Sequence, residues 1–136
     1  MLNNDFHKTY IALLEGNLNE SSGIITAPIA RKENSIIERC ISPNGDLAIT
    51  EFKVLKQYSN YSLVEFALKT GRTHQIRVHS NYIGHPILGD TLYGNCSSLI
   101  QRQALHSYKI SFIHPISNKN VQYTSSIPED ISKLII

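Results

Sequence analysis

Side-chain alternation over residues 47–68 constrains the fold of this 136-residue chain more than any other feature. Within Leu47–Lys56, one side of an extended chain would carry Thr50, Phe52 and Val54, and the residues between them would face the other way. A short connection then leads to Tyr61–Leu68, a second strand-like run. This arrangement predicts a β-hairpin, and a hairpin needs further elements to cover its apolar side.

Four further segments are strand-like. They are Lys8–Glu15, Ser35–Ile41, Ala104–Ile113 and Val121–Ser125. The last two flank a stretch of Pro, Ser and Asn, which are turn-forming residues, and therefore predict a second hairpin.

Helix signals are fewer. One helix is predicted at about Thr73–Tyr82, with Thr73 as its N-cap and an end before Gly84. A short C-terminal helix is predicted to open with the capping-box spacing of residues 126–129, and Gly94–Gln103 is compatible with a further partial turn. Together these elements predict an α+β fold, a mainly antiparallel mixed sheet on which a few helices pack.

The arrangement of these elements leads to a prediction about one cleft. We expect the helix that follows Thr73 to lie beside the strand that begins near Lys8. Such a packing would bring Tyr10 and Arg77 together on one face of the sheet.

The composition is that of an ordinary globular chain, and we expect residues 1–136 to form a single domain. Apolar residues make up 41% and charged residues 18%, and the net charge of +2 leans only mildly toward nucleic acid. Cys40 and Cys96 match no redox or zinc spacing. No signal peptide or membrane-spanning run is apparent, so we expect a cytoplasmic location and no contact with a membrane.

Two dense polar runs follow the second strand of the first hairpin. Residues 70–79 read Thr-Gly-Arg-Thr-His-Gln-Ile-Arg-Val-His, and residues 83–90 read Ile-Gly-His-Pro-Ile-Leu-Gly-Asp, followed by Tyr93-Gly94. So many polar and charged groups in ten residues are unusual for an ordinary helix or strand. A strand–turn–helix junction would hold them against a rigid frame, which is typical of a functional site.

Shorter pieces accompany these two runs. They are Lys8–Ala12 with Gly16, Gly23–Arg31, Ala48–Phe52, and Leu105-His106 with Phe112–Pro115. In content and order, the six pieces resemble the motifs of the RluA-type pseudouridine synthases. The chain departs from the family pattern at Leu14, where valine is usual, and at Ser107, where alanine is usual.

The resemblance implies an activity as well as a fold. RluA-type enzymes isomerise uridine in RNA to pseudouridine without a cofactor: the nucleotide is flipped out of its helix, an aspartate acts as nucleophile, and the base rejoins the ribose through carbon. Their H-R-L-D-x-x-T-S-G motif supplies that aspartate, and residues 1–136 contain nothing like it. The chain is therefore expected to be the C-terminal portion of a catalytic domain and to be inactive by itself.

The resemblance implies that Tyr10 and Arg77 are the catalytic residues within residues 1–136. Tyr10 matches the tyrosine that stacks on the uracil and is proposed to help remove the proton at C5, and Arg77 matches the arginine that pairs with the catalytic aspartate. From the residues alone, a second interpretation is open for each. Tyr10 is as readily a strand tyrosine that packs in the core, and Arg77 is an arginine that forms a salt bridge with a surface acid. Without the H-R-L-D motif, Arg77 is expected to lack its carboxylate partner.

The start of the predicted helix is expected to bind RNA. Arg72, Thr73, His74 and Gln75 lie there, where backbone N–H groups and an arginine suit a phosphate. For His74 and Gln75, hydrogen bonding of the preceding loop is an equally supported alternative. His74 and His79 are five residues apart, which is not the spacing of helical metal ligands, so no metal site is predicted.

Asp90 is expected to stabilise its own loop rather than to act as a nucleophile, because aspartate after glycine favours a turn. Three hypotheses for the chain remain open: part of a synthase acting on structured, ribosomal RNA; a degenerate, non-catalytic RNA-binding protein; and an interaction domain that reuses the fold. An exposed sheet edge would favour self-association, or pairing with an upstream fragment that completes the sheet.

Overall fold

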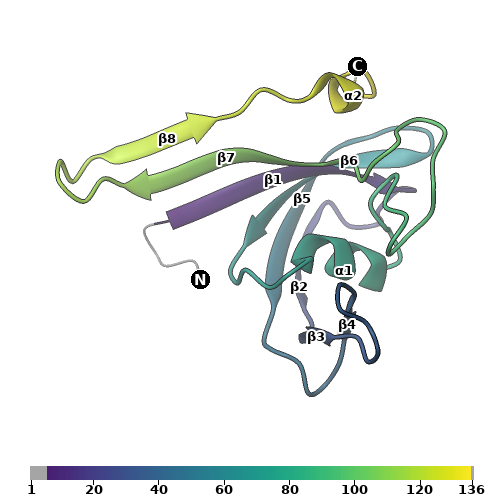
Figure 1. Ribbon diagram of the computed structural model, residues 1–136. Helices are drawn as coiled ribbons and strands as arrows, with labels where there is room; N and C mark the ends of the chain where they lie inside the picture. Colours follow the sequence, from purple (N-terminus) through teal and green to yellow (C-terminus); the bar gives the residue numbers. More distant parts are fainter. Residues whose placement is uncertain (1–5, 136) are drawn as a thin grey trace.

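Eight β-strands and two short helices form the regular structure of residues 6–135, the part of the chain that the computed structural model describes (Figure 1). In chain order they are β1 (Phe6–Glu15), β2 (Ser22–Thr26), β3 (Ile29–Arg31), β4 (Arg39–Ile41), β5 (Ile49–Gln57), β6 (Tyr61–Leu68), α1 (Gln75–Tyr82), β7 (Leu105–Ile113), β8 (Asn120–Thr124) and α2 (Glu129–Ser132).

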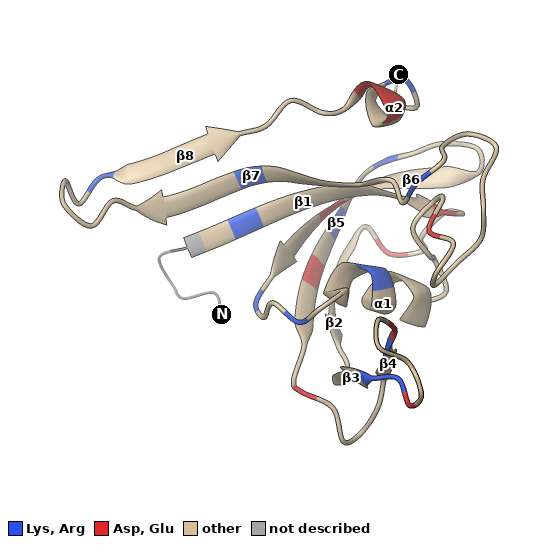
Figure 2. Cartoon of the chain, in the orientation of Figure 1, with Lys and Arg blue, Asp and Glu red and all other residues tan. Residues whose placement is uncertain are grey.

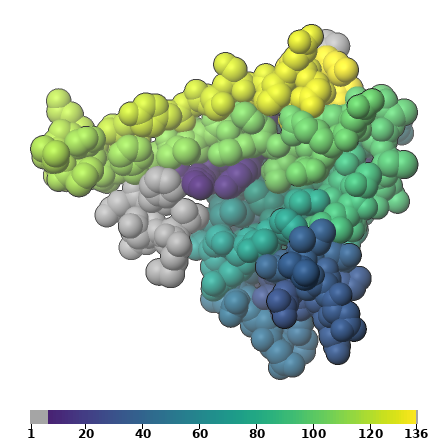
Figure 3. All heavy atoms as spheres, in the orientation of Figure 1, coloured from purple at the N-terminus to yellow at the C-terminus, as the bar shows by residue number. Residues whose placement is uncertain are grey.

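Six of the strands form one sheet in the order β2-β5-β6-β1-β7-β8, and β3 pairs with β4 in a separate hairpin. Every neighbouring pair is antiparallel, so the α+β class is confirmed while the sheet itself is antiparallel throughout rather than mixed. Both predicted hairpins are confirmed, as β5–β6 and β7–β8. In Figures 1 and 3 the β7–β8 hairpin projects away from the rest of the molecule.

The core surrounds the middle of β1. Ile11, Ala12, Leu13 and Leu14 are each at most 3% exposed. Successive residues of a strand point to opposite faces, so four buried in a row require cover on both faces of the sheet. Burying a leucine or isoleucine side chain contributes on the order of 1.5–3 kcal/mol, so Ile11, Leu13 and Leu14 make this segment a large apolar contribution to the fold.

The two helices provide this cover from opposite sides. On the even-numbered side of β6, Val64 and Phe66 are fully buried and share the core with Ile76 of α1. On the odd-numbered side, the Tyr61 hydroxyl donates a hydrogen bond to the carbonyl of Leu134, just after α2. The chain after β8 therefore returns to close the face that α1 leaves open.

The start of α1 differs from the prediction. His74, not Thr73, is the N-cap residue; it has a left-handed backbone with φ of 55°, and no side chain caps the helix. The end is as predicted, because α1 stops at Tyr82 and Gly84 follows with φ of 85°, a conformation that glycine adopts without strain.

The position of α1 on the sheet also needs correction. We expected the helix to lie beside β1, but its side chains hydrogen-bond to β5, two strands away in the sheet order. It reaches β1 through the apolar core around Ile76.

Other local expectations were wrong. The predicted strand Ser35–Ile41 is a strand only over Arg39–Ile41, because residues 32–38 form the connection of the β3–β4 hairpin. No helical turn forms over Gly94–Gln103. The capping box proposed for α2 is absent: Pro128 is the N-cap residue and makes no side-chain cap bond.

None of the helices between residues 6 and 135 is long and apolar enough to cross a membrane.

Candidate functional site

A cleft of about 410 Å³ opens at the N-terminal end of α1. Its lining comes from β1, the ends of β6 and β7, and the segment that leads into α1, and consists of Tyr10, Leu68, Arg72, His74, Gln75, Ile76, Arg77, Gln103 and Leu105. Tyr10 and Arg77, which lie far apart in sequence, therefore border one space. Thr73 is exposed and is not among the lining residues, so its predicted contact with RNA has no support from the cleft.

Arg77 has a carboxylate partner within the chain, contrary to expectation. Its Nε donates to Oδ2 of Asp90 over 2.9 Å, and its Nη2 donates to Oδ1 over 2.8 Å. The Asp90 side chain is fully buried and that of Arg77 is 15% exposed. Burial alone would raise the pKa of Asp90, but the hydrogen bonds and charge of Arg77 outweigh it and hold the pKa below its ordinary value. Asp90 is therefore ionised at neutral pH.

Asp90 also stabilises its own loop, as predicted. Its Oδ1 accepts hydrogen bonds from the backbone N–H groups of Leu92 and Tyr93. The preceding Gly89 has φ of 78°, and a Cβ added there would collide with the carbonyl oxygen of Arg102. Glycine is required at this position, and the tight turn it permits aims the following carboxylate at α1.

Tyr93 links three parts of the site. Its ring lies beneath the guanidinium of Arg77, 5.1 Å from Cζ to the ring centroid, within the range of a cation–π contact. Its hydroxyl accepts a hydrogen bond of 2.8 Å from the backbone N–H of Arg39 in β4, and lies 2.7 Å from Nδ1 of His74. Which of the two groups donates in this contact depends on the tautomer of His74: with the imidazole hydrogen on Nε2, the Tyr93 hydroxyl donates to Nδ1.

His74 stays neutral near pH 7. Burial lowers its pKa, and the positive charges of Arg77 and Arg39 lower it further, against a smaller opposing effect of Asp90. The lining of the cleft thus contains a neutral imidazole beside a cationic guanidinium.

Gln75 borders the cleft and also belongs to a buried polar network. Its side chain is only 2% exposed. Its Oε1 accepts from the Thr70 hydroxyl and from the Arg72 backbone N–H, and its Nε2 donates to the Ile49 carbonyl and the Thr50 hydroxyl. The amide bonds the preceding loop, which is the alternative that the sequence offered for Gln75, and it connects the start of α1 to β5. Contact of Gln75 with RNA stays a prediction.

His79 completes this network. Its Nε2 lies 2.9 Å from the carbonyl oxygen of Ala27 and must donate to it, so Nδ1 accepts the proton of the Thr50 hydroxyl at 2.8 Å. Burial lowers the pKa of His79, which is fully buried. The chain of bonds from Gln75 through Thr50 to His79 ties the helix to the sheet.

Tyr10 and Arg72 complete the cleft. Tyr10 is partly buried and packs against the core, and burial raises the pKa of its phenol, so the hydroxyl remains protonated at neutral pH. Arg72 is exposed, and its Nε donates to the carbonyl of Leu47 over 2.8 Å; among the described residues its terminal nitrogens make no hydrogen bond. Together the two residues provide an aromatic surface and an exposed positive charge.

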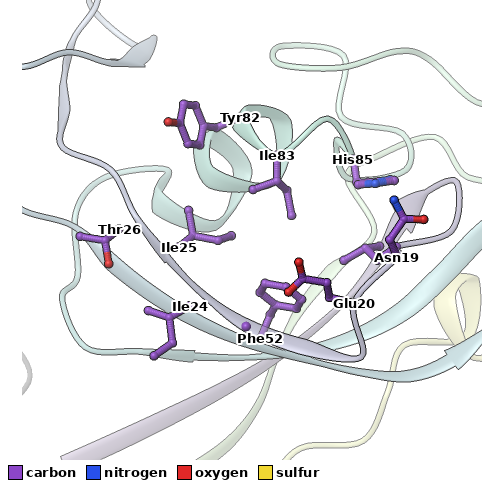
Figure 4. A pocket seen from close by; sticks show the side chains of 11 residues that line it. Asn19, Glu20, Ile24, Ile25, Thr26, Phe52, Tyr82, Ile83 and His85 are labelled. Atoms are coloured by element: carbon purple, nitrogen blue, oxygen red, sulfur yellow. The ribbon is translucent and has the colours of Figure 1, made fainter.

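A second pocket, of about 420 Å³, lies at the other end of α1 (Figure 4). Phe52 contributes an aromatic ring to it, while Glu20, Tyr82 and His85 also line it. None of the residues predicted for the site is among its lining, so we place the site at the N-terminal end of the helix.

The cleft can bind and orient a planar base and an anion, but its lining has no free nucleophile. Asp90, the carboxylate beside it, is fully buried and paired with Arg77. Lys and Arg positions alternate with Asp and Glu positions along the chain, and neither sign is confined to one element (Figure 2). Sequence reasoning assigned no role in the site to Tyr93, although the Gly-Asp-x-x-Tyr-Gly run contained it.

Comparisons with known proteins agree with these motifs. The profile of the family described as RNA pseudouridylate synthase matches residues 1–82. An uncharacterized RNA pseudouridine synthase of Bacillus subtilis, YjbO, is 47% identical over 128 residues, which cover 94% of this chain and 45% of the relative. The ribosomal large subunit pseudouridine synthase D of Xanthomonas campestris is 33% identical over 145 residues, covering 96% and 44%.

The fold is likewise similar to that of a solved structure. Human RNA pseudouridylate synthase domain containing 1 superposes with a TM-score of 0.79 at 29% identity, over 90% of this chain and 55% of that one. The chain thus spans less than half the length of the curated relatives named above, and little more than half of the human domain.

Proposed function

Because this chain belongs to the RNA pseudouridylate synthase family, we propose that it supplies one part of the cleft in which a uridine of structured, ribosomal RNA is isomerised to pseudouridine. The observation that carries the proposal is the meeting of Tyr10 and Arg77 in one cleft of about 410 Å³. An aromatic surface and a fixed cation suit a flipped base and an anionic group beside it.

In this proposal, each residue has a defined task. Tyr10 stacks on the uracil, beside the C5 position from which a proton must be removed, and its hydroxyl stays protonated at neutral pH. Arg77 pairs with the nucleophilic aspartate, which a cation beside it keeps ionised. Arg72, at the exposed rim, contacts an RNA phosphate. A segment with the H-R-L-D motif supplies the nucleophile, and the reaction takes place in the cytoplasm without a cofactor or a metal.

The two edges of the six-stranded sheet are candidate sites for a partner strand. β2 and β8 are the outer strands of the six-stranded sheet. We propose that the H-R-L-D segment, or a second copy of the chain, pairs there, because an unpaired strand edge readily accepts another strand.

The test is release of tritium from 5-tritiated uridine in ribosomal RNA. We expect no release by residues 1–136 alone, and release when a fragment with the H-R-L-D segment is added. A carboxylate elsewhere does not substitute, because misplacing a reacting group by about 1 Å costs on the order of a hundredfold in rate. Turnover by the chain alone would contradict the proposal and direct mutagenesis to Asp90.

The Arg77–Asp90 pair favours a second candidate function. Asp90 neutralises Arg77 within the chain, so the fold is electrostatically balanced without a nucleophile. A non-catalytic RNA-binding protein of the same fold would have this balance. It would bind ribosomal RNA, yet the mixture with the H-R-L-D fragment would release no tritium.

A further inference from the structure

We propose that Asp90 and Tyr93 are positioning residues, which hold Arg77 and His74 so that the Nη1–Nη2 edge of Arg77 and the Nε2–H of His74 are donors that face the cleft. In the complete site this edge of Arg77 receives the nucleophilic aspartate, and in residues 1–136 alone it is open to an anionic group of a bound uridine nucleotide. This inference rests on the proposed function, because it takes RNA as the ligand. In this proposal the Gly-Asp-x-x-Tyr-Gly run of residues 89–94 not only forms a turn but also orients side chains of the cleft.

The first step concerns the edges of the Arg77 guanidinium. A guanidinium has five N–H donors in a planar fork, and a carboxylate binds two of them along one edge. Asp90 takes the Nε–Nη2 edge. Among the described residues no hydrogen bond involves Nη1, so the Nη1–Nη2 edge is the one left for a second anion.

The second step concerns rigidity. Asp90 is held by two backbone N–H groups of its own loop, and Tyr93 lies against the face of the guanidinium. An arginine on an exposed helix samples many rotamers, and binding must then order it at a cost in conformational entropy. Fixing the guanidinium beforehand removes that cost from the binding of the nucleotide.

The third step concerns His74. The Tyr93 hydroxyl accepts a hydrogen bond from the Arg39 N–H, and in this proposal it donates its own proton to Nδ1 of His74, 2.7 Å away. The imidazole then has one tautomer, whose Nε2–H is a donor. A neutral N–H donor suits a carbonyl oxygen of uracil or a phosphate oxygen. The backbone N–H of Arg39, in the β3–β4 hairpin, holds the Tyr93 hydroxyl and thereby the orientation of the His74 ring.

Nuclear magnetic resonance of the whole chain tests the role of Asp90. In wild type we expect a slowly exchanging Nε–H signal from Arg77, and in Asp90→Asn we expect that signal to exchange at least about tenfold faster. Asp130→Asn is the matched control, because Asp130 binds Arg102 in the same two-bond geometry but is 39% exposed. An unchanged Arg77 signal in Asp90→Asn would overturn the proposal.

RNA affinity separates positioning from simple charge. The probe is a uridine-containing RNA stem-loop. Removing a negative charge would by itself strengthen binding, whereas loss of orientation weakens it, so we expect Asp90→Asn to bind about three- to tenfold more weakly than wild type. Equal or tighter binding by Asp90→Asn would also overturn the proposal.

Tyr93→Phe tests the other residue and stands in for Asp90→Asn if that variant does not fold. The phenyl ring still covers Arg77, but the hydroxyl that fixes His74 is gone. We expect the ring ¹⁵N shifts of His74 to change from a single Nε2–H tautomer to a mixture, with weaker RNA binding. A single tautomer with unchanged affinity would contradict the proposal.

The two proposals fail in distinguishable ways. If wild type does not bind the stem-loop at low salt, the proposed function fails. The Arg77 and His74 resonances then still decide whether Asp90 and Tyr93 hold these side chains in place, because neither signal requires RNA.

Discussion

At the scale of single residues, the run 70–79 divides its polar side chains between two tasks. Arg72, His74 and Arg77 line the cleft with exposed or partly exposed side chains, whereas the Gln75 side chain at its border and that of His79 are buried and hydrogen-bonded within the protein. The division follows from burial: a buried amide or imidazole must find partners inside the protein, while a rim guanidinium keeps donors available for a ligand.

Arg72→Ala is expected to weaken RNA binding mainly through the loss of a phosphate contact. Each lost contact flattens the dependence of log affinity on log salt by about 0.7–0.9. The measurement is a salt series of binding to the RNA stem-loop, with Arg31→Ala as the control, because Arg31 is an equally exposed arginine on the separate β3–β4 hairpin. An unchanged slope and affinity in Arg72→Ala would restrict Arg72 to its hydrogen bond with Leu47.

At the scale of elements, a buried polar network, rather than the predicted side-chain cap, holds the start of α1 in place. No side chain caps α1. Instead, Gln75 bridges the turn after β6 and the start of β5, and His79 connects the middle of the helix to Thr50 and Ala27. Such fully satisfied buried networks specify one orientation of an element, which places Arg77 in the cleft.

This network makes stability dependent on pH. Burial lowers the pKa of His79 in the folded state, so the unfolded chain takes up a proton more readily. The stabilisation is therefore complete above the ordinary histidine pKa of about 6.5 and is lost as the pH falls below it. The slope is at most about 1.4 kcal/mol per pH unit for one proton.

Urea unfolding at several pH values between about 5 and 8 checks this prediction. His79→Gln should have a smaller decrease in unfolding free energy toward acid than wild type, because glutamine has an amide donor and an acceptor but no titrating group. His7→Gln, at an exposed position of β1, is the control for loss of a histidine as such. Parallel pH profiles of wild type and His79→Gln would refute the assignment.

At the scale of the whole molecule, the two faces of the sheet depend on segments from different parts of the chain. α1 covers one face and α2 the other, and Ile131 of α2 is fully buried in the main core. The cleft lies on the α1 face, so α2 contributes to stability without lining the site.

Ile131→Ala should lower the free energy of unfolding by about 2–5 kcal/mol, because it leaves a cavity in a packed core. Ile116→Ala, at a position that is 90% exposed, is the matched control and should change stability by no more than about 0.5 kcal/mol. Chemical denaturation of the two variants provides the comparison. Equal stabilities would mean that α2 does not close the second face.

Several features of the molecule followed from the sequence alone. Alternation and turn residues are local properties, so they determined the two hairpins of the main sheet and the strand at Lys8–Glu15. Local capping patterns were less reliable. Thr73 and the sequence 126–129 matched cap signatures, but the N-cap residues are His74 and Pro128, and neither makes a side-chain cap bond.

The sequence by itself determined the family, the antiparallel hairpins and the run that contains Arg77, because motifs and periodicity lie within short segments. Only the tertiary structure decided which groups meet. Asp90 pairs with Arg77 from a loop that follows the helix, and Tyr93 reaches back to Arg39, 54 positions earlier. Contacts between distant residues depend on how whole elements pack, and no local pattern of residues encodes that packing.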